Sequence, residues 1–390
     1  MKMSGKRLNS NTSHFEDKNR ERPTSLHNTT TISQHEDPHD RWSKSRPPER
    51  QQTPDQIQTL TGWGIGISSG ILAEHILAHP CKVLRRQCQV HYNSHRFHVT
   101  PFTILPVMYN LQQQQGISAL WKGISSVFVC DGIQMVSETV ISEVTPLPKE
   151  ISRHNTIKKH AEHLLLKGLS IIVTTPFLVS SLVETVQSDI SSERPGVFNC
   201  LTEGASRLMS VGTSPFTKLV PIWWLALPTG FVGLSRYIIM QMARYTVVTA
   251  IHQEEQEKQE RRPDHSEEWM PAKSMYDIHF PEMLASFTGH LLADMMLFPF
   301  ETVLHRLYLQ GTRTIIDNTD SGLSVIPYST DYKGVLDCFR DIVQNEGIAG
   351  LYKGFGALVL QYAVHAAILR LAKFFFKKIS DEYAARKVRQ

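Results

Sequence analysis

The chain has 390 residues, of which 41% are apolar and 20% are charged, a balance that excludes both a protein disordered throughout and an uninterrupted bundle of lipid-facing helices. The net charge of +4 is too small to favour nucleic-acid binding, so we expect no nucleic-acid partner. The five cysteines are scattered and form no CxxC pair, which argues against a disulfide framework.

Residues 1–55 form a hydrophilic N-terminal tail, in which charged residues are mixed with Ser, Thr, Asn and Pro. A segment of this composition buries too little apolar surface to offset the entropy lost on folding, so we predict that it is disordered. It contains no apolar stretch typical of a secretory signal, and its acidic residues Glu16, Asp17 and Glu21 argue against a mitochondrial presequence.

Long apolar segments follow the tail, and several approach the ~20 residues that an α-helix needs to cross a bilayer. Charged residues such as Glu138, Asp294 and Arg370 interrupt them, and in lipid such groups should face the interior of a helix bundle or a wet cavity. A soluble α-helical protein is the alternative, but the apolar run Ile222–Ile239 is difficult to place in one. We therefore predict an all-α membrane protein with about six transmembrane helices. The apolar segments are Leu60–Leu77, Phe102–Leu111, Ile117–Val144, His163–Val183, Leu219–Ile251, Met283–Leu307 and Phe355–Ile379.

Two sequence motifs each occur twice in the apolar body. The first begins at a proline that ends an apolar segment and continues through a polar, basic turn, as in Pro80–Gln87 and Pro299–Arg306. The second is a polar residue and a glycine, then four residues, then aromatic-lysine-glycine, as in Gln115–Gly123 and Glu346–Gly354. Because both motifs recur in the same order, they predict tandem repeats of one helical unit. The residues that carry the motifs are Pro80, Arg85, Gly116, Trp121, Lys122, Gly123, Pro299, Glu301, Arg306, Gly347, Tyr352, Lys353 and Gly354.

The two motifs resemble the mitochondrial carrier family (solute carrier family 25), whose members consist of three tandem two-helix repeats. A decayed third copy lies between the clear ones, because Pro176 follows an apolar run and Gly196–Cys200 is similar to Gly334–Cys338. Gly212 and Lys218 also keep the glycine-to-lysine spacing of the second motif. The resemblance is strong for the first and third repeats, and it implies a mitochondrial-carrier fold built of three degenerate repeats.

The repeats divide the chain into segments with distinct expected roles. These are the tail 1–55, a first carrier repeat at 58–150, a degenerate second repeat at 160–251, a hydrophilic loop at 252–275, a third repeat at 277–382 and a C-terminal tail at 383–390. With six spans, both termini and the 252–275 loop lie on one side of the membrane. We predict that the N-terminus is cytosolic.

The resemblance also implies how a carrier closes its transport path. An acidic residue two positions after one motif proline pairs with a basic residue five positions after another. Here the acidic positions hold Lys82, Leu178 and Glu301, and the basic positions hold Arg85, Ser181 and Leu304. Of these, only Arg85 and Glu301 can form an ion pair. On the opposite side, carriers place an acid after an aromatic residue, whereas Phe376 is followed by Lys377. We therefore expect that the chain is not an alternating-access exchanger.

Eight short segments resemble one branch of the family whose members reside in the mitochondrial outer membrane, among them residues 77–90, 299–307 and 310–320. This implies a non-enzymatic, multi-pass outer-membrane adaptor that controls mitochondrial dynamics (fusion and fission), organises cristae and takes part in lipid transfer from the endoplasmic reticulum. The implied partners are membrane lipids, mitofusin-like and inner-membrane dynamin-like fusion GTPases, a cristae-organising complex and endoplasmic-reticulum contact proteins. The alternative is an inner-membrane solute transporter of the same family with a weakened gate.

The best candidate for an interaction site is the loop Gln310–Asp320, which contains Arg313, Asp317, Asn318 and Asp320. Two interpretations stay open. The loop binds a partner, or its polar side chains tie down the turn before a short helix expected at Lys333–Gln344.

Other motifs do not indicate a chemical activity. Gly66 and Gly70 have the small-xxx-small spacing of closely packed membrane helices. His75 and His79 share a helical face, but Pro80 disrupts that helix and no standard spacing of metal ligands follows. There is no nucleophile elbow, P-loop or zinc-protease motif. We therefore expect no catalytic residue, no metal site and no cofactor.

Overall fold

The structure of the protein is a computed structural model that describes residues 72–150, 156–190, 196, 198–209, 220–260, 275–322 and 324–388. The N-terminal tail 1–55 and most of the first expected span, Leu60–Leu77, lie outside these residues. Gly212 and Lys218 of the degenerate repeat and the second half of the expected loop 252–275 lie outside them as well.

The second and third repeats each consist of a long helix, a short helix and another long helix, in this order. The described part of the first repeat begins with the end of its first helix and then has the same order. The first repeat consists of a π-helical turn η1 (Leu72–Leu77), α3 (His79–Val90), α4 (Pro101–Gln115), a 3-10 turn η2 (Ile117–Trp121) and α5 (Ile124–Val144). The second consists of α6 (Ile157–Val186), α7 (Asn199–Leu208) and α8 (Ile222–Glu260). The third consists of α9 (Met275–Leu309), the strands β1 (Ile315–Asp317) and β2 (Val325–Pro327), α10 (Val335–Asn345), a 3-10 turn η3 (Ile348–Tyr352) and α11 (Phe355–Val388). The two strands form an antiparallel hairpin in which Ile316 pairs with Ile326.

The described part of the chain contains five helical segments that are long and apolar enough to cross a membrane: Ile117–Val144, Ile157–Val186, Ile222–Lys258, Phe280–Leu309 and Ile348–Phe375. Large apolar side chains such as Met135, Trp224 and Phe231 are exposed on these helices, as expected of surfaces that face hydrocarbon. The predicted all-α membrane fold is thus confirmed. Of the sixth expected span, only the π-helical turn Leu72–Leu77 is described.

The segment expected to be a loop from residue 252 begins as a helix, because α8 continues to Glu260. Gln, Glu and Lys are strong helix formers, and Glu254 pairs with Lys258 one turn later at 2.6 Å. In the same way α11 runs through most of the expected tail 383–390, to Val388. The expected short helix at Lys333–Gln344 lies at Val335–Asn345.

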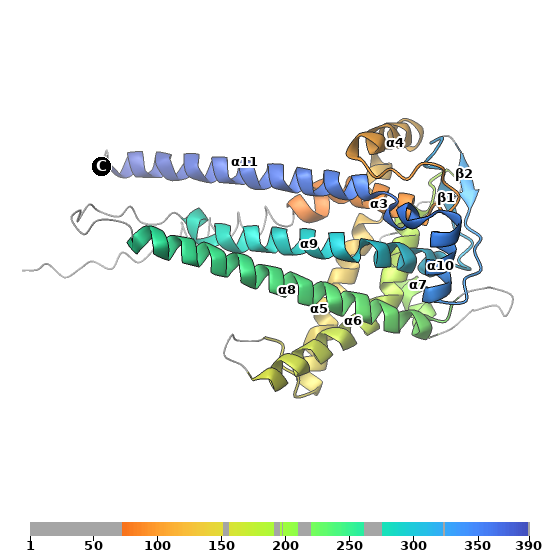
Figure 1. Cartoon of the computed structure of the whole chain (residues 1–390), viewed down its shortest axis with the longest axis horizontal. Coiled ribbons are helices and arrows are strands. Elements are labelled where there is room, and N and C mark those ends of the chain that lie inside the picture. Colours follow the sequence, from red (N-terminus) through yellow and green to blue (C-terminus); the bar gives the residue numbers. More distant parts are fainter. Residues whose placement is uncertain are drawn as a thin grey trace, which may run out of the picture. The chain divides into compact units, whose positions relative to one another are not determined.

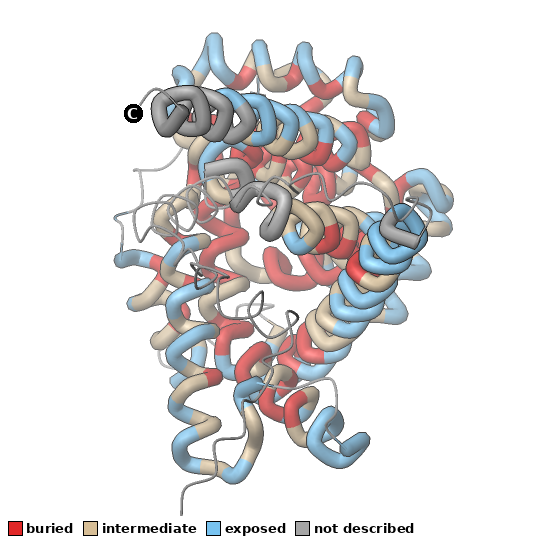
Figure 2. Tube along the Cα trace, turned by 90° about the vertical axis from the view of Figure 1, so that its left-hand side faces the viewer, coloured by how far each residue is buried: buried red, intermediate tan, exposed pale blue. Residues whose placement is uncertain are grey.

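Helices α8, α9 and α11 run side by side, and α5 pairs with α6 (Figure 1). The short helices α4, α7 and α10 and the hairpin gather at one end of the bundle, where α3, α6 and α9 finish (Figure 1). We call this the hairpin end. Its apolar core includes Val186, Leu307, Ile316, Tyr328 and Ile342. Figure 2 shows that buried residues lie on the inner sides of the helices and exposed residues on their outer sides.

Candidate functional site

The glycines of the second motif adopt backbone conformations that favour glycine. Gly116 and Gly347 end α4 and α10 with φ of 82° and 75°, whereas Gly123 and Gly354 precede α5 and α11 with φ of 66° and 80°. A Cβ on Gly354 would lie 2.8 Å from the Cβ of Cys88. The motif therefore encodes a left-handed turn and a close approach of α11 to α3.

The prolines and aromatic residues of the motifs have structural positions. Pro80 lies in the first turn of α3 and Pro299 lies inside α9. The indole Nε1 of Trp121 donates to the carbonyl oxygen of Ile76 at 3.0 Å. The ring of Tyr352 stacks on Phe298, with the ring centroids 6.0 Å apart.

Lys353 of the third repeat caps the carboxyl end of α3. Its Nζ lies 2.7 Å from Oε2 of Glu346 and donates to carbonyl oxygens after α3, the nearest being that of His91 at 3.0 Å. Arg306 holds the same glutamate through Nη2 at 2.9 Å and donates from Nε to the carbonyl oxygen of Gln89 at 3.0 Å. Because Arg306 and Lys353 are fully buried, the carboxylate between them balances charge that water cannot screen.

Lys122 of the first repeat caps the carboxyl end of α6 in the same manner. Its Nζ donates to the carbonyl oxygen of Gln187 at 3.1 Å and to Oε1 of Gln115 at 2.6 Å. Its nearest carboxylate belongs to Asp317 of the hairpin, at 3.2 Å, and Asp189 lies at 3.6 Å. The two lysines of the repeated motif thus join each repeat to a neighbouring one.

The candidate interaction loop is engaged within the chain. Asp317 is buried, and Asn318 accepts a hydrogen bond from the backbone N–H of Asp320 at 2.9 Å. Asp320 accepts from the backbone N–H groups of the loop after α3, that of His95 at 2.8 Å and that of Arg96 at 3.0 Å. These contacts match the interpretation in which polar groups tie down the turn. Arg313 is exposed, with φ of 55°, and its role in partner binding stays a prediction.

A buried network of charges surrounds Arg85. Its Nη2 lies 3.1 Å from Oε1 of Glu301, and its Nη1 lies 3.3 Å from Oδ2 of Asp294. Asp294 is also bonded to Arg236 of α8 and accepts from the Tyr362 hydroxyl of α11 at 2.9 Å. The structure thus brings together the two residues that the sequence pattern pairs. It adds three partners from α8, α9 and α11.

The three charged residues of the apolar segments do not converge. Glu138 pairs with Lys167 of α6 at 2.7 Å, Asp294 belongs to the network around Arg85, and Arg370 is exposed. At the other positions expected to close a carrier, Leu304 is buried, and Ser181 bonds to the hydroxyl of Ser126 at 3.0 Å. Leu304 and Ser181 therefore add no charged pair to that of Arg85 and Glu301, whereas Glu138 and Lys167 pair across the first and second repeats at a different place.

The histidines near α3 are bound to protein groups. His79 Nε2 lies 2.8 Å from the carbonyl oxygen of Lys122, and His91 Nδ1 lies 2.7 Å from the hydroxyl of Thr319. Burial lowers the pKa of His91 to about 4, and burial also lowers the pKa of His98. Across the described ranges no group of three His, Cys, Asp or Glu side chains is arranged to hold a metal ion.

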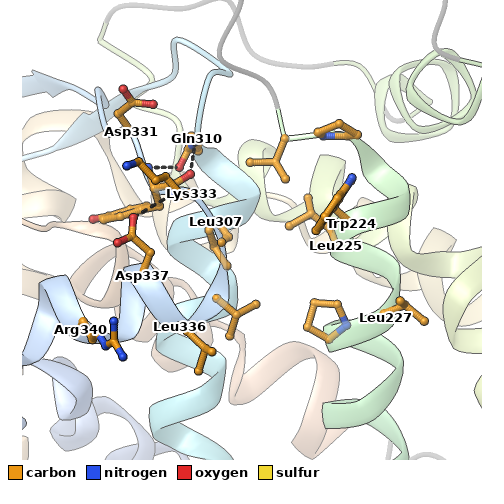
Figure 3. Close-up of a pocket in the computed structure, with 16 residues that line it drawn as sticks. Trp224, Leu225, Leu227, Leu307, Gln310, Asp331, Lys333, Leu336, Asp337 and Arg340 are labelled. Carbon is orange, nitrogen blue, oxygen red and sulfur yellow. Dashed lines mark hydrogen bonds between the residues drawn. The ribbon is translucent and has the colours of Figure 1, made fainter.

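A groove of about 900 Å³ opens at the hairpin end between the start of α8, the end of α9 and α10 (Figure 3). Trp224, Leu225 and Leu227 line it from the side of α8, and Leu336 lines it from α10. Lys333 and Arg340 on the α10 side are accompanied by the carboxylates of Asp331 and Asp337, so both signs of charge line this edge. The groove therefore combines an apolar interior with a polar edge. No sequence motif indicated it.

Comparison with known proteins gives one family. The model of the family described as mitochondrial carrier protein matches residues 55–145 and 279–383, which correspond to the first and third repeats. The mitochondrial outer membrane protein SLC25A46 of Gallus gallus is 45% identical over 328 residues, which cover 83% of this chain and 78% of that protein. The protein of the same name from Danio rerio is 43% identical over 357 residues, covering 91% and 86%, and that from Homo sapiens is 44% identical over 329 residues, covering 84% and 77%.

Proposed function

This chain belongs to the mitochondrial carrier family, and we propose that it acts as a non-enzymatic, carrier-like adaptor of the mitochondrial outer membrane. In this role it controls the balance of fusion and fission, organises cristae and takes part in lipid transfer from the endoplasmic reticulum. Relatives that are 43–45% identical are named as mitochondrial outer membrane proteins, which supports this compartment. The apolar helices support a multi-pass protein.

The charge pattern at the junctions of the repeats is the observation that carries this proposal. An exchanger that opens alternately on two sides needs matched charge pairs that break and reform at every repeat junction. Here Arg85 and Glu301 form one such pair, while Leu178 and Leu304 offer no charge. Arg85 is also bonded to Asp294 in a buried site, and breaking a buried charge pair is strongly unfavourable. A fixed scaffold fits this arrangement better than a transport cycle.

The proposed partners are membrane lipids, mitofusin-like and inner-membrane dynamin-like fusion GTPases, a cristae-organising complex and endoplasmic-reticulum contact proteins. The groove beside Trp224 supports the lipid part of the proposal, because its apolar interior fits acyl chains. Arg313 supports a protein contact, since it is an exposed cation on an otherwise engaged loop.

The adaptor role is tested by replacing the endogenous protein in cells with tagged variants. We expect the natural chain to restore mitochondrial length and, after crosslinking, to capture a fusion GTPase or a cristae protein. Arg313→Glu is expected to reduce the capture, whereas the matched control Arg313→Lys keeps the charge and the capture. Normal mitochondrial length in cells that lack the protein, with no such protein captured, would reject the adaptor role.

The second candidate is an inner-membrane solute transporter with a weakened gate. One observation favours it: Arg236 is bonded to Asp294 while 37% of its side chain is exposed, so a cation stays accessible beside the buried network. Uptake of anionic solutes by liposomes that contain the purified protein, lost in Arg236→Ala, would favour this candidate over the adaptor.

A further inference from the structure

The first repeat lacks two charges that the third repeat has. In the third repeat, Glu346 lies between Arg306 and Lys353. The matching positions of the first repeat hold Gln115, Gln87 and Lys122. The lysine is therefore present in both repeats, but two glutamines replace its glutamate and arginine. A buried lysine without a carboxylate partner is strongly unfavourable.

Asp317 of the hairpin occupies the place of the missing carboxylate. Its Oδ2 accepts from Lys122 Nζ at 3.2 Å and from Gln87 Nε2 at 3.1 Å, and its Oδ1 accepts from Gln115 Nε2 at 2.7 Å. Asp317 and Lys122 are 195 residues apart in the chain, and both are buried. The third repeat thus supplies the counter-charge that the first repeat does not encode.

The hairpin is bonded to two further parts of the hairpin end. The backbone N–H of Ser188, just after α6, donates to the carbonyl oxygen of Ile315 at 2.8 Å, and Gln187 extends the sheet by pairing with Ile316. Asp320 binds the two backbone N–H groups of the loop after α3 described above. Gly322 lies against α4 so closely that a Cβ there would be 2.8 Å from Asn110.

We infer that the hairpin formed by β1 and β2 is a permanent latch that holds together the ends of α3, α4 and α6, and that Asp317 is the residue that fixes it. Separation of these ends would break three hydrogen bonds of one buried carboxylate at once and remove the nearer of the two carboxylates beside Lys122. The latch goes beyond the proposed function, because it concerns the conformations open to the chain itself and holds in any membrane.

The test uses a paired substitution in the purified full-length protein in detergent micelles. Asp317→Ala alone removes both the latch and the counter-charge of Lys122. The double variant Gln115→Glu/Asp317→Ala restores a carboxylate beside Lys122 within its own repeat, as Glu346 does for Lys353, while the bonds to the hairpin are lost. Asp337→Ala removes an exposed carboxylate of α10 and is the matched control.

Hydrogen–deuterium exchange is followed in residues 91–97, 185–190 and 315–327, with a segment of α8 as the reference for global unfolding. In the double variant we expect exchange in the three segments to accelerate at least about tenfold while α8 keeps its natural protection, because only local opening becomes easier. Asp337→Ala should leave all segments unchanged. Natural protection of the three segments in the double variant would overturn the latch. Equal loss of protection in α8 would also overturn it, since Asp317 would then support the whole fold.

Discussion

Arg85 Nη1 lies 3.3 Å from Asp294 Oδ2 across the interface between the first and third repeats, and both side chains are buried. Because Arg236 of α8 and Tyr362 of α11 bind the same carboxylate, α3, α8, α9 and α11 meet at one charge. One buried carboxylate therefore links helices of all three repeats.

We predict that Asp294→Ala destabilises the protein by about 3–5 kcal/mol, because it removes the carboxylate partner of Arg236 and one of the two carboxylate partners of the buried Arg85. Glu282→Ala is the control, since it removes an exposed pair with Arg244 and should cost less than about 1 kcal/mol. Unfolding in detergent micelles measures both. A similar decrease in the free energy of unfolding in the two variants would show that Asp294 does not organise the bundle.

Leu307 is fully buried at the hairpin end of α9. Leu307→Pro should destabilise the protein by ~3 kcal/mol or more, because proline in a helix interior removes a backbone hydrogen bond and clashes with the preceding turn. Leu307→Met keeps the volume and should cost less than about 1.5 kcal/mol. Steady-state amounts in mitochondria report the difference. Normal accumulation of Leu307→Pro would mean that α9 is placed incorrectly.

Alanine substitutions at Gly347 and Gly354 distinguish the cost of backbone strain from the cost of steric overlap of the added Cβ. Both have positive φ, so alanine at either position should cost about 1–3 kcal/mol in backbone strain. A Cβ on Gly347 meets nothing within 4 Å, whereas on Gly354 it meets Cys88 at 2.8 Å. Gly354→Ala should therefore lower the Tm more than Gly347→Ala does. Equal decreases would show that α11 does not press against α3.

The stability of the protein should depend on the protonation of His91, which is buried beside Thr319. Burial lowers the pKa of His91 from 6.5 to about 4; Asp320 opposes this effect, and Lys353 adds to it. Between these pKa values the unfolded state binds more protons, so stability is full above pH 6.5 and decreases as the pH falls toward 4.

We predict that the Tm of the natural protein in micelles decreases between pH 7 and pH 4.5 by more than that of His91→Gln, which does not titrate. Comparison of the two decreases cancels the contribution of the acidic groups common to both proteins. A decrease of equal size in the two proteins would contradict a neutral, buried His91.

The groove makes the lipid part of the proposal testable. Leu336→Asp places a charge in its apolar interior and should reduce transfer of a fluorescent phospholipid between vesicles by about tenfold, the effect of ~1.4 kcal/mol of lost binding. Phe198→Asp alters a side chain that is also exposed, at the start of α7, and should leave transfer unchanged. Equal transfer by both variants would exclude the groove from lipid handling.

The parts of the fold that depend on local sequence patterns could be predicted from the sequence. These parts include the turns at glycines with positive φ, the start of α3 at a proline and the apolar helices. Each depends on residues only a few positions apart in the chain. The pairing of Arg85 with Glu301 was implied by the resemblance to the carrier family, which pairs the residues at these positions after two motif prolines. Helix formation in residues 252–260 was not expected, because their polarity indicates exposure but does not distinguish a loop from an exposed helix.

The contacts of Asp317 and Asp294 could not be predicted from local sequence patterns. Asp317 meets a lysine 195 residues away, and Asp294 meets side chains from three other helices. Neither the periodicity of apolar residues nor the spacing of motifs predicts contacts between residues so far apart in the chain. One signal was present: Gln115 and Gln87 stand where the third repeat has Glu346 and Arg306, which left Lys122 in need of a carboxylate from elsewhere.

We propose that the chain is an outer-membrane adaptor with its N-terminus in the cytosol. Protease treatment of intact mitochondria that contain an N-terminally tagged protein tests it most directly, with outer- and inner-membrane markers as controls. We predict that the tag is lost while the outer membrane is intact. Protection of the tag until the outer membrane is ruptured would contradict the claim and favour an inner-membrane solute transporter.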